Sequence, residues 1–391
     1  MAAEELFPED FEPTSLPLIL SDSARKVAGG VADRVRAVLE LREELRRELR
    51  ASGRLRPIPR DAPPLSCVAI DSGYTVPSLD LVVGKLVIYV RSCTFWRCSP
   101  PRPSRSEAAV KFYTDAVPED LPKLETKVFE RQLALELLDA KERGDADFDV
   151  LLLDGEIVPR GVPPGLRRNP QLLKRIVGKV LGVTRELVEK ARATGTPVIG
   201  IVKRVQGKDL SLILNRRLGM NDKAVATLVL NPGEYVYMGD VETIRSLARR
   251  SEERRWRERA RYLELILSHV PKLASVEVVV YKSRNYVMYG LATKAEVLEV
   301  GDYSLTELVA WLSRITSQTG VPYPIDLVDE LSRVRPEVVA CLHQRLMAMA
   351  VEEARSIGVS EAAVVKALGL LNPEKSFPYY YWRNLRRLLR R

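Results

Sequence analysis

Histidine is almost absent from this chain, with two residues, His269 and His343, among 391. A metal site built on several histidines is therefore excluded, and any metal would be held mainly by carboxylates, which favours Mg²⁺ or Mn²⁺. The four cysteines exclude a disulfide scaffold and favour a reducing cytoplasm. No apolar run reaches the roughly 18 residues that a membrane helix needs, so we expect no membrane association.

Asparagine and glutamine are also scarce, at 12 residues together, while arginine and glutamate are abundant. This composition favours a thermophilic source. Lysine and arginine number 61 against 52 acidic residues, which gives a net charge of +9. A basic balance bears on partners rather than on the fold, and it makes nucleic acid the leading candidate partner.

Alternating strand and helix patterns predict an α/β fold with a sheet covered on both faces. Apolar runs predict buried strands at 67–71, 148–156 and 196–205, with a β-rich segment at 79–93. Later strands are expected at 235–238, 274–282 and 295–300. Helices are expected at 22–52, 121–143, 171–194, 221–230, 241–269, 304–318, 324–334, 337–357 and 360–370. Loops are expected at 99–106 and 161–170.

The chain divides into three parts by composition and pattern. Residues 1–64 form an N-terminal helical segment that ends in a Pro/Arg-rich linker. Residues 65–335 carry the strands and acids of the main domain. Residues 336–391 are expected to form C-terminal helices and a tail rich in aromatic and basic residues.

Three acids are the candidate metal ligands. Asp71 and Asp154 each end a buried strand, and Glu136 interrupts an apolar stripe on the helix between them, whereas Glu130 falls on a mixed face. Converging carboxylates repel one another, and a divalent cation removes that repulsion. The pattern therefore predicts a metal cradle suited to phosphodiester chemistry. The alternative is that each aspartate caps a helix or begins an Asx turn.

Two further charged residues follow strands or precede helices. Lys203 ends the third buried strand, where a cation beside the acids would orient a scissile phosphate. Its other interpretation is an ordinary strand-end lysine that faces water. Asp222 precedes an apolar run, which favours a role as a helix cap.

The ordered motifs between Val68 and Leu331 resemble the NurA nucleases of archaea and some bacteria. They read AIDSGY, VLLLDGEI, PVIGIVKR, NDKAVATLVLNPGEY and PYPIDL. The resemblance implies an RNase H-like mixed sheet flanked by helices and a homodimer with a central channel. It implies Mn²⁺-dependent 5′-to-3′ exonuclease and single-strand endonuclease activity on DNA. It also implies a hexameric HerA-type ATPase as partner in DNA-end resection and double-strand-break repair.

The resemblance assigns Asp71, Glu136 and Asp154 as metal-binding acids, and Tyr323 as the tyrosine of the C-terminal motif. The family commonly carries an Ala-His pair shortly after that Tyr-Pro, and this chain has no histidine there. Asp329 is the favoured replacement ligand. The alternative is that Asp326 and Asp329 only lie near the positive end of the helix that Pro324 begins, which would leave a weak nuclease or one that needs its partner for activity.

Arginines and aromatic residues are candidates for DNA contacts. The candidates for binding phosphates are Arg102, Arg105, Arg167, Arg168, Lys203 and Arg204. Trp96 and the tail residues 379–382 are candidates for stacking on unpaired bases, although solvated helices and core aromatics are the blander interpretation.

Two other functions remain open. Residues 71–75 read DSGYT, which matches the DxGxT phosphate-binding turn of actin- and sugar-kinase-like phosphotransferases, but the chain's Gly-Gly pair lies at 29–30, ahead of the first strand. A DNA-binding adaptor of a ring translocase, with little or no catalysis, is the third interpretation. The missing histidine is its main support.

Overall fold

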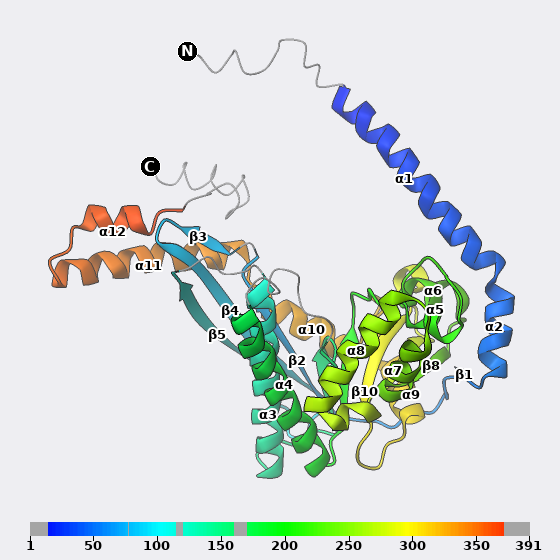
Figure 1. The fold of residues 1–391 in the computed structure, drawn as a ribbon. Helices are drawn as coiled ribbons and strands as arrows, with labels where there is room; N and C mark the ends of the chain where they lie inside the picture. The colour runs from blue at the N-terminus through cyan, green and yellow to red at the C-terminus, as the bar shows by residue number, and fades with distance from the viewer. Residues whose placement is uncertain (1–14, 77, 115–119, 160–169, 371–391) are drawn as a thin grey trace.

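A computed structural model describes residues 15–76, 78–114, 120–159 and 170–370 (Figure 1). These residues form one mixed ten-stranded sheet with large apolar clusters on both faces. None of the helices in the described segments is long and apolar enough to cross a membrane.

The strands pair in the order β1-β8-β9-β10-β7-β6-β2-β4-β3, with β5 on β4. Their bounds are β1 Leu55–Pro57, β2 Cys67–Tyr74, β3 Leu79–Leu81, β4 Gly84–Trp96, β5 Arg105–Tyr113, β6 Val150–Asp154, β7 Val198–Val202, β8 Glu234–Asp240, β9 Glu277–Lys282 and β10 Thr293–Leu298. β2, β6 and β7 run parallel, and the other pairs are antiparallel. The order β5-β4-β2-β6-β7 fits the RNase H-like core that the resemblance implies.

The parallel strands are continuous apolar runs because helices cover both of their faces. The helices are α1 Ser15–Glu40, α2 Arg42–Ala51, α3 Asp120–Glu142, α4 Pro170–Ala193, α5 Asp209–Ile213, α6 Asp222–Val229, α7 Val241–Arg250, α8 Arg254–His269, α9 Leu305–Ile315, α10 Tyr323–Ser332, α11 Pro336–Ser356 and α12 Glu361–Ala367, with 3₁₀ turns η3 Pro271–Ser275 and η4 Met288–Gly290. The apolar cluster on one face draws on α3, α4, α7 and α8, and that on the other face draws on α9 and α10.

The two ends of the described chain lie outside this layered centre. α1 extends away from the sheet in Figure 1, whereas α11 and α12 lie along β3 and β4. A separate apolar cluster that includes Leu79, Leu86 and Val339 joins α11 to those strands.

Several predicted elements differ from the structure. The helix expected at 22–52 is two helices that break at Leu41, and the helix expected at 241–269 breaks at 251–253. The strand predicted to end at Asp71 continues to Tyr74 because it pairs with β4 up to Tyr89. The loop expected at 99–106 gives way to β5 at Arg105. The alternation that predicts a strand is absent from β5, since most of its residues are exposed.

Candidate metal centre

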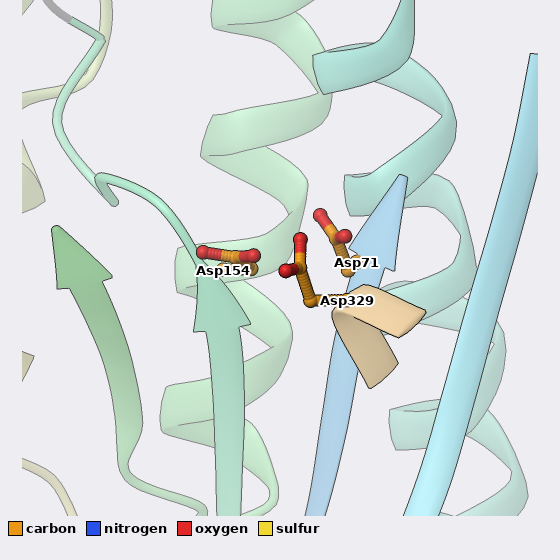
Figure 2. A group of neighbouring side chains, drawn as sticks. All are labelled: Asp71, Asp154 and Asp329. Carbon is orange, nitrogen blue, oxygen red and sulfur yellow. The ribbon is translucent and has the colours of Figure 1, made fainter. Parts of the chain in front are cut away.

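Three aspartates converge at the carboxyl ends of the parallel strands (Figure 2). Asp71 lies in β2 and Asp154 ends β6, and the pairing of Ile70 with Leu153 makes the two acids neighbours. Asp329 reaches the same point from α10. One carboxylate oxygen from each residue lies within 4.8 Å of the others. The structure therefore brings together two of the acids predicted as ligands and the predicted replacement for the histidine.

Close packing of α10 on β2 places Asp329. A Cβ added to Gly73 would lie 2.3 Å from the carbonyl oxygen of Ser332, so only glycine permits this approach. The buried Ser332 hydroxyl in turn donates to Asp71. Gly73 lies within strand β2 and packs against α10, so the DSGYT segment is not a phosphate-binding turn. The phosphotransferase interpretation therefore loses the motif on which it rested.

The other acids of α10 have different partners. Asp326 accepts hydrogen bonds from the hydroxyls of Ser317 at 2.5 Å and Thr319 at 2.8 Å, which anchor the start of the helix. Glu330 pairs with Arg333 at 3.1 Å. Asp329 is thus the one of the three that faces the acidic group.

The prediction that Glu136 is buried is wrong. Its side chain is 45% exposed and pairs with Arg91 at 2.8 Å. Glu130, six residues earlier on α3, is instead 1% exposed and accepts a hydrogen bond from the Ser72 hydroxyl at 3.3 Å. Its charge raises the pKa of Asp71, so Glu130 belongs to the acidic group electrostatically. The buried face of α3 is therefore the face that mixes apolar and polar residues, because its polar residues reach the acids at the carboxyl ends of the strands.

Two lysines counter the acids. Lys203 Nζ lies 2.5 Å from Asp154 Oδ2 and 3.1 Å from Asp329 Oδ1. Burial disfavours the charged form of Lys203, but the two carboxylates outweigh burial and raise its pKa. Lys127 Nζ lies 3.4 Å from both carboxylate oxygens of Glu130 and donates to the carbonyl of Asp154 at 3.4 Å. The solvent-facing interpretation of Lys203 is therefore wrong.

Burial and mutual repulsion perturb the aspartates. Burial, then the charges of Asp154 and Glu130, raise the pKa of Asp71 to about 8. Burial raises the pKa of Asp154 to about 6, against the opposing effect of Lys203. Carboxylates that repel one another in this way match the hard oxygen ligands that Mn²⁺ and Mg²⁺ prefer. The donor set thus fits a divalent cation.

A rigid turn after β6 holds Asp154 in place. The buried Arg131 donates through Nη2 to the carbonyls of Glu156 and Ile157, at 3.2 and 3.1 Å. Glu296, on β10, accepts the amides of Ile157 and Val158 through one oxygen, at 2.8 and 2.9 Å. Two buried side chains of opposite charge therefore fix the same turn from both sides.

A cavity of about 1150 Å³ opens beside the acids. Its wall includes Asp154 and Asp329, Tyr262 and Leu263 of α8, and five cations, Lys123, Lys127, Lys203, Arg204 and Arg259. The wall therefore combines cations and acids with apolar and aromatic surface. Such a mixture suits a ligand with a phosphate and a flat apolar part.

The remaining predicted residues lie elsewhere or have other partners. The Tyr323 ring is 42% exposed and packs edge-on against Trp96, with 5.1 Å between ring centroids. Arg102 lies over the Phe95 ring at 5.8 Å, and Arg105 pairs with Glu107. Arg167, Arg168 and the tail aromatics lie outside the described residues.

Asp222 is not the helix cap that was predicted. Asn221 caps α6 by accepting the amide of Ala224 at 2.9 Å. Asp222 is fully buried and binds Lys294 Nζ at 2.7 Å, and Lys294 also binds Asp209 at 2.8 Å. This buried charged cluster borders the cavity through Asp209.

Sequence reasoning missed Lys127, Glu130 and Ser332. The spacing of Lys127 and Glu130 by three residues places them on one helical face, which was the available signal. Ser332 carries no signal, because its role depends on contact with a strand far away in the chain.

Comparison with known proteins agrees with this fold. The crystal structure of the NurA nuclease from Sulfolobus solfataricus superposes with a TM-score of 0.54 and 13% identity, covering 84% of this chain and 98% of that one. A crystal structure of NurA with manganese gives a TM-score of 0.50 and 11% identity, covering 84% of this chain and 98% of that one. No curated protein matches. The NurA domain matches residues 65–334, most of the chain, so this chain belongs to the NurA family.

Proposed function

We propose that this protein is a metal-dependent DNA nuclease that hydrolyses phosphodiester bonds with Mn²⁺, or alternatively Mg²⁺. The observation that carries the proposal is the convergence of Asp71, Asp154 and Asp329 within a NurA-family domain. A similar fold has been crystallised with manganese. A bound divalent ion supplies activation of water and stabilisation of the leaving oxygen.

The three aspartates would hold the ion, and Glu130 would contribute its charge from α3. Ser332 orients Asp71 through its hydrogen bond, while Lys127 and Arg131 hold the backbone around Asp154. Lys203 lies close enough to the acids to contact a phosphate bound there. Tyr323, Arg102 and Arg105 remain predictions that rest on the resemblance and on charge.

The cavity beside the acids is the proposed path for the DNA strand. Lys203 and Arg204 at its wall would bind phosphates, and Tyr262 at the same wall would offer an aromatic face. We further infer 5′-to-3′ exonuclease and single-strand endonuclease activity, a homodimer, and a HerA-type hexameric ATPase as partner in DNA-end resection. The family resemblance supports these finer assignments.

One observation favours a second function, a catalytically weak adaptor of the translocase. Lys203 engages two of the three aspartates, so a metal ion would compete with an ammonium group for their oxygens. The missing histidine points in the same direction. An adaptor would stimulate the ATPase of its partner and cut no DNA with any divalent ion.

Cleavage of labelled single- and double-stranded DNA in Mn²⁺, Mg²⁺ and EDTA tests the proposal. The wild-type protein should cut in Mn²⁺, and Asp71→Asn should lose cleavage by about a hundredfold or more while still binding DNA. Asp302→Asn, an exposed acid ahead of α9, is the matched control and should keep full activity. Equal cutting by wild type and Asp71→Asn in EDTA would rule out this site as the source of activity.

A further inference from the structure

A second surface feature lies at the same edge of the sheet. Residues 283–292, here the aromatic loop, join β9 to β10 and expose three large side chains. Tyr286 is 75% exposed, Tyr289 84% and Met288 48%. Large apolar side chains that are exposed together on one short loop are candidates for an interaction site. None of the roles proposed above uses them.

The backbone of the aromatic loop is firmly held. The Met288 amide donates to the Gln318 carbonyl at 2.7 Å, and Asn285 Nδ2 donates to the Arg314 carbonyl at 2.9 Å. The Ala292 amide donates to the Thr227 hydroxyl at 2.9 Å. Tyr289 has a φ of 59°, a left-handed conformation that costs free energy for a non-glycine residue. The loop thus presents its rings from a fixed, strained backbone.

The pairing of the strands places this loop beside the acidic group. β10 begins directly after the loop, and its Lys294 pairs with Val202, the last residue of β7. Ile201 in turn pairs with Asp154. Two strand spacings therefore separate β10 from the strand of Asp154, roughly 10 Å across the sheet. The rings and the acids lie at the same edge.

A basic strip links the two features. It consists of Lys203, Arg204, Lys223 and Lys282. Lys223 Nζ donates to the Lys203 carbonyl at 3.4 Å, and Lys282 Nζ donates to the Thr227 carbonyl at 2.9 Å. Thr227 lies on α6 with Lys223 and also anchors the aromatic loop, so α6 connects the Lys203 segment to the loop. Surfaces that bind single-stranded nucleic acid combine cations, which contact the phosphate backbone of the strand, with aromatic rings, on which its bases stack.

We propose that the aromatic loop binds unpaired bases of single-stranded DNA, with Tyr286 and Tyr289 stacking on bases whose phosphates lie on the basic strip. Two tyrosines offer at most about 500 Å² of contact, less than the roughly 800 Å² per partner of a stable protein interface. Their few rotatable bonds make stacking cheap in conformational entropy. The inference rests on DNA being the substrate of the proposed nuclease.

Equilibrium binding in EDTA, where the proposed metal-dependent cleavage cannot occur, tests the loop on the full chain. The probes are a fluorescein-labelled 20-nucleotide dT strand and a 20-base-pair duplex. The double variant Tyr286→Ala/Tyr289→Ala should bind the single strand about ten- to a hundredfold more weakly, and the duplex within about threefold of wild type. Tyr286→Phe/Tyr289→Phe keeps both rings and should bind like wild type.

Phe112→Ala is the matched control, because Phe112 is 46% exposed on β5 at the opposite side of the sheet. It should leave binding of both probes unchanged. Photocrosslinking of strands that carry single 5-bromodeoxyuridines should label the aromatic loop in wild type. Unchanged single-strand binding by the alanine variant would overturn the proposal. An equal loss of duplex binding in the alanine variant would also overturn it. A change in the molar mass of that variant, measured by light scattering, would do the same, because it would mark the loop as a protein-docking surface.

These outcomes separate the loop from the nuclease proposal. Wild type that binds dT strands through the loop but cuts no DNA would overturn the nuclease and leave the loop assignment standing. Wild type that cuts DNA in Mn²⁺ while the alanine variant binds dT normally would overturn only the loop assignment.

Discussion

At the scale of single residues, the decisive distinction lies between two glutamates of one helix. Glu130 is buried beside Asp71, and Glu136 is exposed and paired with Arg91. We expect Glu130→Gln to lower Mn²⁺ affinity by about ten- to a hundredfold, as removal of a supporting carboxylate does. Glu136→Gln should leave the Mn²⁺ affinity almost unchanged, because Glu136 pairs with Arg91 and is not among the charges that shift the pKa of Asp71 or Asp154. Isothermal titration with Mn²⁺ measures both, and the reverse ranking would restore Glu136 as the ligand.

The perturbed aspartates predict how metal binding depends on pH. The pKa of Asp71 is raised to about 8 and that of Asp154 to about 6, so both must release protons before they bind a cation. Mn²⁺ affinity should therefore rise as the pH increases from 6 to 8. Asp71→Asn should bind more weakly and show a flatter dependence. An affinity that is constant across this range would show that Asp71 is already ionised at pH 6.

At the scale of elements, the contact between β2 and α10 determines whether Asp329 lies beside Asp71. Gly73→Ala would place a methyl group against the Ser332 carbonyl, which must then shift with the end of α10. We expect a loss of about 1–3 kcal/mol in the free energy of unfolding and weaker Mn²⁺ binding.

Gly178→Ala is the matched control for that variant. Gly178 lies in α4, and an added Cβ there meets nothing within 4 Å. The substitution should raise stability by roughly 0.5–1 kcal/mol through helix propensity and leave metal binding unchanged. Urea unfolding and Mn²⁺ titration of the two variants make the comparison. An unaltered Mn²⁺ affinity in Gly73→Ala would show that the packing of α10 on β2 does not determine metal binding.

Sequence patterns predicted those elements whose signal is local. The apolar runs of β2, β6 and β7 and the acids Asp71 and Asp154 were readable, because a strand buried on both faces needs an uninterrupted apolar run. Glu130 was missed because the buried face of α3 was predicted from its apolar residues alone. A helix that borders a charged site also buries polar side chains. Ser332 depends on a contact across the sheet that no local pattern records.

At the scale of the whole molecule, the buried acids should make the metal-free protein less stable as the pH rises. Asp71 has a pKa near 8 when folded against an ordinary 3.8, so the folded state binds the proton more tightly. The resulting stabilisation is complete below about pH 4 and is lost as the pH rises to about 8. The melting temperature in EDTA should therefore fall between pH 6 and 8, and Asp71→Asn should flatten the slope.

Mn²⁺ should reverse that loss, since a ligand that binds only the folded state stabilises it by about 2.7 kcal/mol at a hundredfold excess over its dissociation constant. Thermal scans at pH 8 with and without Mn²⁺ measure the effect. An identical melting temperature in both conditions would show that the acids hold no ion. Asp302→Asn should follow wild type in every scan.

The dependence on α10 also has a consequence for synthesis on the ribosome. Asp71, Glu130 and Asp154 all lie in the first half of the chain, while Asp329 and Ser332 come from residues far toward its end. At translation rates of roughly 5–20 residues per second, the 258 residues from Asp71 to Asp329 take roughly 13–50 s to appear. A nascent chain therefore lacks the last carboxylate for most of its synthesis, and the candidate metal site is completed only when almost the whole domain has been made.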